Sequence, residues 1–350
     1  MTKPFSAILY MMRYPARVFK IFRLYRVLKG KYKVTMIFAH IYRESIYKKR
    51  DKKHIFNKNM MQEENQVLNN QKIIINIHDG VLRSGGLTDR LKGMCTLYMI
   101  AKKHNFQFKI YFVSPFKLEK YLSPNLYDWK IDEKQISYNY KKTATYTWEN
   151  EELADVFFRL NKDKEQLHIS CNSAESSKSY SNLFAELFKP SLYLSDILDF
   201  HLKELGGSSE YISISFRFQN LLGEFAEGRS VSLSKTRQKI LVEKCLNAVE
   251  EIKDSHIDIE KVLITSDSNL FREAVKCKYP YIYTFIISEE IGHMDYSDAG
   301  KGKELTAFLD MFLISTARKA YQVKSAEMYN SDFPRMAAKI NNVPYEVTLV

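Results

Sequence analysis

The sequence predicts an α/β protein with two domains, each built on a parallel sheet with helices on both faces. Short apolar runs alternate with helical segments through most of residues 72–342, and this alternation is typical of repeated βα units. The chain has 350 residues, which is enough for two domains of ordinary size. No apolar run reaches the roughly 18 residues that a membrane-spanning helix needs.

The first domain is expected over residues 72–207, after a polar linker over residues 61–71. Its apolar or alternating runs predict strands over Ile73–Ile77, Phe106–Val113 and Leu167–Cys171. Helices are expected after the first strand to about Asn105, over Glu151–Leu160, and from Pro190 to Gly206-Gly207, where the domain ends. Tyr138–Trp148 is polar with alternating Tyr and Thr, which predicts one or two short exposed strands.

The second domain is expected over residues 208–350, where the alternation is cleaner. Strands are predicted over Tyr211–Phe218, Lys261–Thr265, Tyr281–Ile287 and Ala320–Lys324. Helices are predicted over Ser234–Lys253, Ser268–Lys278, Glu304–Lys319 and Asp332–Ile340. In parallel sheets of this kind ligands bind at the carboxyl ends of the strands, so the site is expected in the loops that follow them.

Residues 1–60 form a basic, aromatic-rich arm with 16 Lys+Arg and two Asp+Glu, a balance of +14, whereas the rest of the chain carries −2. Arg17–Lys29 fits an amphipathic helix with an apolar arc of Val18, Ile21, Phe22, Leu24, Tyr25 and Leu28. Such a helix could lie in an anionic membrane surface, pack on the domain, or bind RNA. The near-neutral body argues against nucleic acid. Because the body carries almost no net charge, deletion of residues 1–60 is expected to leave a soluble protein.

Cysteine and histidine spacing gives no sign of a metal site. The four cysteines lie far apart without a Cys-x-x-Cys pair, and the eight histidines show no His-x-x-x-His spacing. Isolated cysteines also suit a reducing compartment, so the protein is expected in the cytoplasm.

The loop after the first strand holds four of the twelve glycines, between Gly80 and Gly93. Gly85 and Gly86 are expected to turn with positive φ and to let the backbone approach a ligand closely. Asp89 and Arg90 follow in the first helical turn, beside that ligand. The alternative is an ordinary βα turn with a surface ion pair. The spacing is not the dinucleotide motif Gly-x-Gly-x-x-Gly.

Three junctions in the second domain carry candidate ligand-binding groups. Arg217 lies at the carboxyl end of a strand, where its planar guanidinium could grip a diphosphate or form a buried ion pair with a carboxylate. Ser266 and Asp267 end the next strand, where Asp267 could cap the following helix. Ser331 and Phe333 precede the last helix, whose N-terminal amides could face a phosphate.

Together these loops resemble the motifs of GDP-fucose-dependent fucosyltransferases, from the first strand to the last helix. Gly85–Gly93 resembles that family's Gly-Gly-Leu-Gly-Asn/Asp-Arg-Leu loop, and Ser215–Arg217 matches its His-x-Arg motif at the arginine. Thr265–Ser268 resembles Thr-Asp-Asp/Ser. Residues 329–338 resemble Ser-x-Phe-Ser-x-x-Ala, with Asp332 in place of the commoner glycine. The arm lies outside the resemblance.

The resemblance implies the GT-B architecture of two Rossmann-like domains, with the acceptor in the first and the nucleotide sugar in the second. It implies a bacterial polysaccharide-type enzyme that transfers fucose from GDP-fucose to a glycan hydroxyl with inversion, without a metal or other cofactor. The alternatives are a glycosyltransferase of the same fold with another nucleotide sugar, and a non-catalytic membrane-associated binding protein. The acceptor would be lipid-linked, and the arm would hold the enzyme at the inner membrane face.

The resemblance also assigns roles to residues. Arg217 and Asp89 are the expected catalytic residues, Arg217 by stabilising the departing diphosphate. The donor nucleotide is expected on Arg217, Ser266, Asp267, Ser331 and Phe333, with Asp267 accepting from guanine. The acceptor side is expected on Gly85, Gly86, Asp89 and Arg90. The candidates for a general base are Asp89, Glu224 and Asp310.

Overall fold

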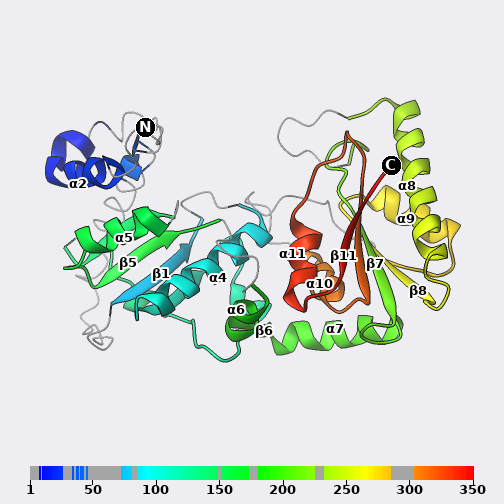
Figure 1. Cartoon of the computed structure of the whole chain (residues 1–350), viewed down its shortest axis with the longest axis horizontal. Coiled ribbons are helices and arrows are strands. Elements are labelled where there is room, and N and C mark those ends of the chain that lie inside the picture. Colours follow the sequence, from blue (N-terminus) through cyan, green and yellow to red (C-terminus); the bar gives the residue numbers. More distant parts are fainter. Residues whose placement is uncertain are drawn as a thin grey trace. The chain divides into compact units, whose positions relative to one another are not determined.

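The computed structural model describes residues 8, 10–26, 34, 37–38, 40–42, 45, 72–80, 85–139, 141–148, 151–172, 180–224, 232–284 and 303–350. These residues form two compact α/β units (Figure 1). The first unit is drawn from Met1–Ser84, Asp89–Val113 and Tyr127–Ser177. The second is drawn from Gly85–Thr88, Ser114–Leu126 and Lys178–Val350.

The first unit is built on a four-stranded parallel sheet in the order β2-β1-β5-β4. Its strands are β1 (Ile73–His78), β2 (Gln107–Phe112), β4 (Thr143–Thr147) and β5 (Gln166–Ser170). Helix α4 (Leu87–Lys103) connects β1 to β2, and α5 (Glu151–Leu160) connects β4 to β5. The central strand β1 is buried along its whole length, which is why it reads as a continuous apolar run.

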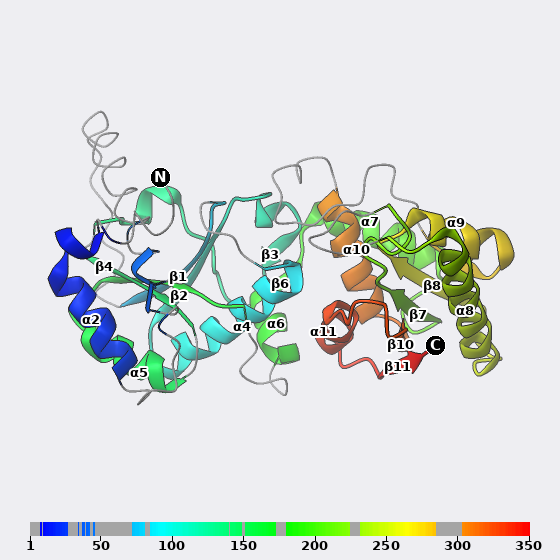
Figure 2. The same ribbon diagram turned by 90° about the horizontal axis from the view of Figure 1, so that it is seen from above.

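Strand β4 is buried, so the prediction of an exposed strand is wrong. Only Thr147 of its five residues is partly accessible. The reason is the arm, whose helix α2 (Pro15–Arg26) packs on α5 next to this outermost strand (Figure 2). Arg17 Nη2 donates to the Thr143 carbonyl at 3.1 Å, and His40 Nε2 donates to the Thr145 carbonyl at 2.9 Å. The described part of the arm therefore belongs to the first unit.

The second unit has a five-stranded parallel sheet in the order β11-β10-β7-β8-β9. Its strands are β7 (Tyr211–Phe216), β8 (Lys261–Ser266), β9 (Ile282–Tyr283), β10 (Lys319–Lys324) and β11 (Tyr345–Leu349). Its later helices are α8 (Lys235–Asp254), α9 (Asn269–Lys278), α10 (Lys303–Ser315) and α11 (Phe333–Ile340). The sequence did not predict β11, because its mostly exposed side chains leave no apolar run. Residues 285–287, predicted to extend β9, lie outside the described residues.

The second unit also begins earlier in the chain than the expected boundary at Gly207. Helix α6 (Tyr180–Leu187) packs on α11, and α7 (Leu192–Glu204) packs on α10. Strand β3 (Leu122–Pro124) pairs antiparallel with β6 (Phe188–Pro190). Short 3-10 turns lie at Leu118–Lys120 in this unit and at Glu133–Gln135 in the first. The linker expected over residues 61–71 lies outside the described residues.

Candidate functional site

Three of the candidate site residues lie in loops at the carboxyl edge of the second unit's sheet. Arg217 follows β7, Asp267 follows β8, and Ser331 lies in the loop after β10. These strands are parallel neighbours, so their carboxyl ends share one edge. The strand order reverses at β7, with β8 and β9 on one side and β10 and β11 on the other. Such a switch point is where open α/β sheets bind ligands.

Arg217 and Asp267 form an ion pair at this edge, with 3.1 Å between Arg217 Nη1 and Asp267 Oδ2. The sheet register produces the pair, because Phe216 lies opposite Ser266 and the next residue of each strand is therefore adjacent. The Arg217 side chain keeps 25% of its surface exposed, whereas that of Asp267 keeps 4%. The guanidinium is thus held by a buried carboxylate and is still accessible to a ligand.

Asp267 organises the loop after β7 as well. Its Oδ1 accepts the Phe218 N–H at 2.8 Å, and its Oδ2 accepts the Gln219 N–H at 2.7 Å. These bonds hold Gln219 at φ 52°, a conformation that non-glycine residues rarely adopt. Burial raises the pKa of the Asp267 carboxyl, while Arg217 and the two N–H groups oppose the rise. In this structure the Asp267 carboxylate therefore binds the Arg217 guanidinium and two backbone N–H groups, whereas the resemblance implied that it would bind guanine.

Helix α9 is capped by Ser268 and Glu224, which leaves no capping role for Asp267. Ser268 Oγ accepts the Phe271 N–H at 3.1 Å. The Glu224 carboxylate accepts the Leu270 N–H at 3.0 Å and the Ser268 hydroxyl. Ser266, the predicted nucleotide ligand, is buried, and its Oγ accepts the Ser268 N–H at 3.1 Å. Glu224 thus stabilises a helix terminus.

Asp310 is engaged by a buried arginine. Arg272 Nη2 lies 3.3 Å from Asp310 Oδ2, and the Arg272 side chain is fully buried. Arg272 also donates to the Ser266 carbonyl at 2.9 Å and to the Thr284 hydroxyl at 3.2 Å. Burial raises the pKa of Asp310 to about 6, although Arg272 opposes the rise. The pair joins α9, α10 and the end of β8, which is a structural role.

The loop before α11 holds Ser331 and Phe333 half-buried at the start of the helix. Ser331 Oγ accepts the Phe333 N–H at 3.3 Å. Asp332 is bound by Arg335, whose Nε donates to Oδ1 at 2.6 Å. Arg335 thereby offsets the negative charge that replaces the family's glycine. Pro334 occupies the first turn, where its missing N–H costs nothing.

In the first unit, the carboxyl end of β1 carries a buried polar cluster. His78 Nε2 bonds Asn76 Oδ1 at 2.7 Å, and Asn76 Nδ2 donates to the Ile169 carbonyl at 2.9 Å. Arg90 is 3% exposed and lies 5.2 Å from the centre of the Phe112 ring. Burial, with the Arg90 charge, lowers the pKa of His78 to about 3, so its imidazole is neutral.

Solved structures of several fucosyltransferases have a similar fold. The NodZ α-1,6-fucosyltransferase of Bradyrhizobium, in crystals soaked with GDP-fucose, superposes with a TM-score of 0.52 at 13% identity, over 77% of this chain and 92% of that one. A mutant of Arabidopsis thaliana FUT1 in complex with GDP superposes with a TM-score of 0.50 at 9% identity, over 90% of this chain and 79% of that one. The chain has the fucosyltransferase fold. The predicted GT-B architecture is confirmed. No protein-family model and no curated protein sequence matches the chain.

Within this fold, the glycine-rich loop differs from its prediction. Gly86 does not have the positive φ expected of it, and a Cβ there would meet nothing within 4 Å. Gly80, at φ 79°, lies in the left-handed region. Gly93 is required by packing, because a Cβ would lie 1.8 Å from the Cys171 carbonyl oxygen where α4 crosses the end of β5. Gly85 is half-buried just before α4.

The surface ion pair that was the alternative for this loop is present: Asp89, whose side chain is 44% exposed, pairs with Lys92 at 2.8 Å, one turn along α4. Arg90 is buried. Of the three general-base candidates, Asp89 and Glu224 are accessible, whereas Asp310 is buried. In the described part of the chain, no group of three or more His, Cys, Asp or Glu side chains could hold a metal ion.

Proposed function

We propose that this protein is a glycosyltransferase that transfers fucose from GDP-fucose to a glycan hydroxyl with inversion at the anomeric carbon. The observation that carries the proposal is Arg217, a partly exposed guanidinium anchored on Asp267 at the switch point of a fucosyltransferase fold. The NodZ crystals soaked with GDP-fucose and the FUT1 complex with GDP support the choice of nucleotide.

In the proposed reaction the acceptor oxygen forms a bond to the anomeric carbon as the bond from that carbon to the β-phosphate oxygen breaks. Arg217 donates to the diphosphate and stabilises the charge that develops on it. Ser331 donates its hydroxyl to a phosphate at the start of α11, and Phe333 packs beside the nucleotide. The residues supply the positive charge, so the proposal includes no metal or other cofactor.

The acceptor proton is assigned to Asp89. Both carboxylate oxygens of Glu224 accept bonds at the start of α9, and Asp310 is buried against Arg272. Asp89 pairs with Lys92 through Oδ1 on the partly accessible first turn of α4. Gly85, Gly86 and Arg90 complete the proposed acceptor side. The acceptor is proposed to be a lipid-linked bacterial surface polysaccharide, so the enzyme would work in the cytoplasm at the inner membrane face. No helix in the described ranges is long and apolar enough to cross a membrane.

Thermal shift with GDP, UDP, ADP and CMP tests the nucleotide. A ligand at 100 times its Kd stabilises a protein by about 2.7 kcal/mol, so GDP is expected to raise Tm by roughly 5–10 °C. The other three nucleotides at the same concentration should shift it far less. A shift with UDP alone would mean a glycosyltransferase with another donor. Release of GDP from GDP-fucose then separates an enzyme from a non-catalytic binding protein.

Asp267→Ala should weaken GDP binding about 10–100-fold, the range for a lost hydrogen bond to a charged group. Because Asp267 anchors Arg217 and the Phe218 and Gln219 N–H groups, the loss should fall on the diphosphate. Inosine diphosphate lacks the exocyclic amine of guanine, so it separates the two roles. Isothermal titration should show equal losses for both nucleotides. If the variant instead binds the two equally while the wild type prefers GDP, Asp267 recognises guanine.

A further inference from the structure

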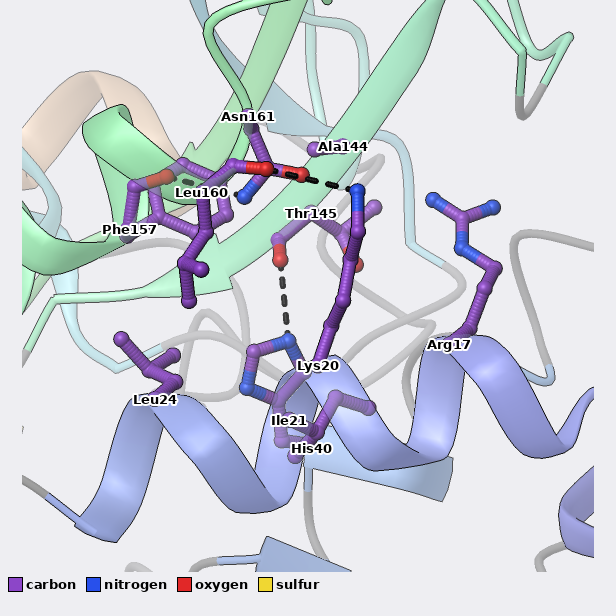
Figure 3. Close-up of a pocket in the computed structure, with 10 residues that line it drawn as sticks. All are labelled: Arg17, Lys20, Ile21, Leu24, His40, Ala144, Thr145, Phe157, Leu160 and Asn161. Carbon is purple, nitrogen blue, oxygen red and sulfur yellow. Dashed lines mark hydrogen bonds between the residues drawn. The ribbon is translucent and has the colours of Figure 1, made fainter.

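Helix α2 has two different faces, and the inner one is part of the protein. Val18, Ile21, Leu24 and Tyr25 are at most 7% exposed. Ile21 and Leu24 line a pocket with Phe157 and Leu160 of α5 (Figure 3). The described part of the apolar arc that was expected to enter a membrane is therefore largely covered by the first unit, and that mechanism of membrane binding is wrong for this helix.

Two cations of the helix bind backbone carbonyls of the first unit with their end groups. Arg17 donates to the Thr143 carbonyl at 3.1 Å, and Lys20 Nζ donates to the Leu160 carbonyl at 3.3 Å. Figure 3 shows the Lys20 side chain extended from α2 toward that carbonyl. These side chains hold the helix against β4 and the end of α5.

The outer face combines large apolar side chains with arginines. Phe19 is 69% exposed and Phe22 43%, and Met12, which precedes α2, is 78% exposed. Arg23 and Arg26 are exposed on the same side, since residues three, four and seven apart share a helix face. The first 43 residues contain no acidic residue that could offset these charges.

We propose that this outer face, defined by Phe19, Phe22, Arg23 and Arg26 of α2, binds an anionic lipid surface together with the exposed Met12 that precedes the helix. Aromatic and Met side chains enter the boundary between head groups and acyl chains, while arginines on the same face reach lipid phosphates. Each arginine near an anionic surface contributes about a 5-fold gain in partitioning before salt screening. The inference deepens the proposed membrane location and rests on it, and it is independent of which sugar is transferred.

Sedimentation of the full-length protein with vesicles tests the surface. At low salt the wild type should sediment with vesicles of phosphatidylglycerol and phosphatidylcholine, and not with phosphatidylcholine alone. The double variant Arg23→Gln/Arg26→Gln should partition at least 10-fold less, and Phe19→Ser/Phe22→Ser should lose binding to a similar extent. Lys20→Gln is the matched control, because it removes a cation whose ammonium is bound to the Leu160 carbonyl of the first unit, and it should change partitioning less than 3-fold.

The inference fails if the wild type ignores anionic vesicles at low salt, or if the outer-face variants bind as Lys20→Gln does. It also fails if a single-stranded oligonucleotide binds more tightly than the vesicles and displaces them, since the face would then be an RNA site. The GDP-induced thermal shift is measured on every variant. Loss of the GDP-induced thermal shift would count against the proposed function. Loss of sedimentation with an intact thermal shift would show that the variant affects only the membrane-binding surface.

Discussion

Arg217→Lys should abolish transfer almost as completely as Arg217→Ala, with a loss of kcat of about 10²–10³-fold in each case. The guanidinium has enough donors to pair with Asp267 and to bind two phosphate oxygens in one plane, whereas a lysine is a point charge. A lysine here would have to choose between the buried carboxylate and the diphosphate. Formation of GDP from GDP-fucose with acceptor present measures the loss.

Arg318→Lys is the control for this prediction. Arg318 is an arginine of the same unit that pairs with Asp258, and it precedes β10, so it lies at the amino edge of the sheet, away from the proposed site. Its variant should keep wild-type turnover. Near-normal turnover of Arg217→Lys would show that the diphosphate does not depend on a planar, two-point contact, and the proposed role of Arg217 would be wrong.

Ile21→Asp should destabilise the first unit by several kcal/mol, because it places a carboxylate in the apolar contact between α2 and α5. Phe19→Asp makes the same kind of change two residues earlier on the exposed face. It should alter the free energy of unfolding by no more than about 0.5 kcal/mol. Urea denaturation of both full-length variants measures the difference. Equal stability of the two would mean that α2 does not pack on the unit.

Removal of residues 1–26 extends the same prediction. It would expose the apolar surface under α2 and the Thr143 carbonyl on the outermost strand β4. An uncovered strand edge pairs readily with other chains, so size-exclusion chromatography should show aggregated protein. This reverses the expectation from charge alone, in which deletion of the arm leaves a soluble protein. A monomeric product with wild-type stability would restore that expectation.

The sequence by itself determined the alternation of strands and helices in both units. Central parallel strands such as β1 and β7 are buried on both faces, so their apolar runs are a local signal that survives without tertiary context. The ends of those strands are visible for the same reason. Arg217 and Asp267 could therefore be placed at strand ends from the sequence, and Ser331 in the loop before the last helix. Strands β4 and β11 have no continuous apolar run. The polar side chains of β4 are buried and those of β11 are mostly exposed, and the sequence does not distinguish the two cases.

The tertiary structure decided what those residues contact. Asp267 anchors Arg217 because the register of β7 and β8 places them side by side. In the sequence they are far apart, since Asp267 lies 49 positions after Phe218, the residue that follows Arg217. The arm shows the same limit. Periodicity gives α2 two faces, yet an apolar arc suits a membrane and a protein surface equally, since both offer removal from water. Only the tertiary structure shows that α5 and β4 cover the inner face of α2. Phe19 and Arg23 therefore remain exposed on the outer face.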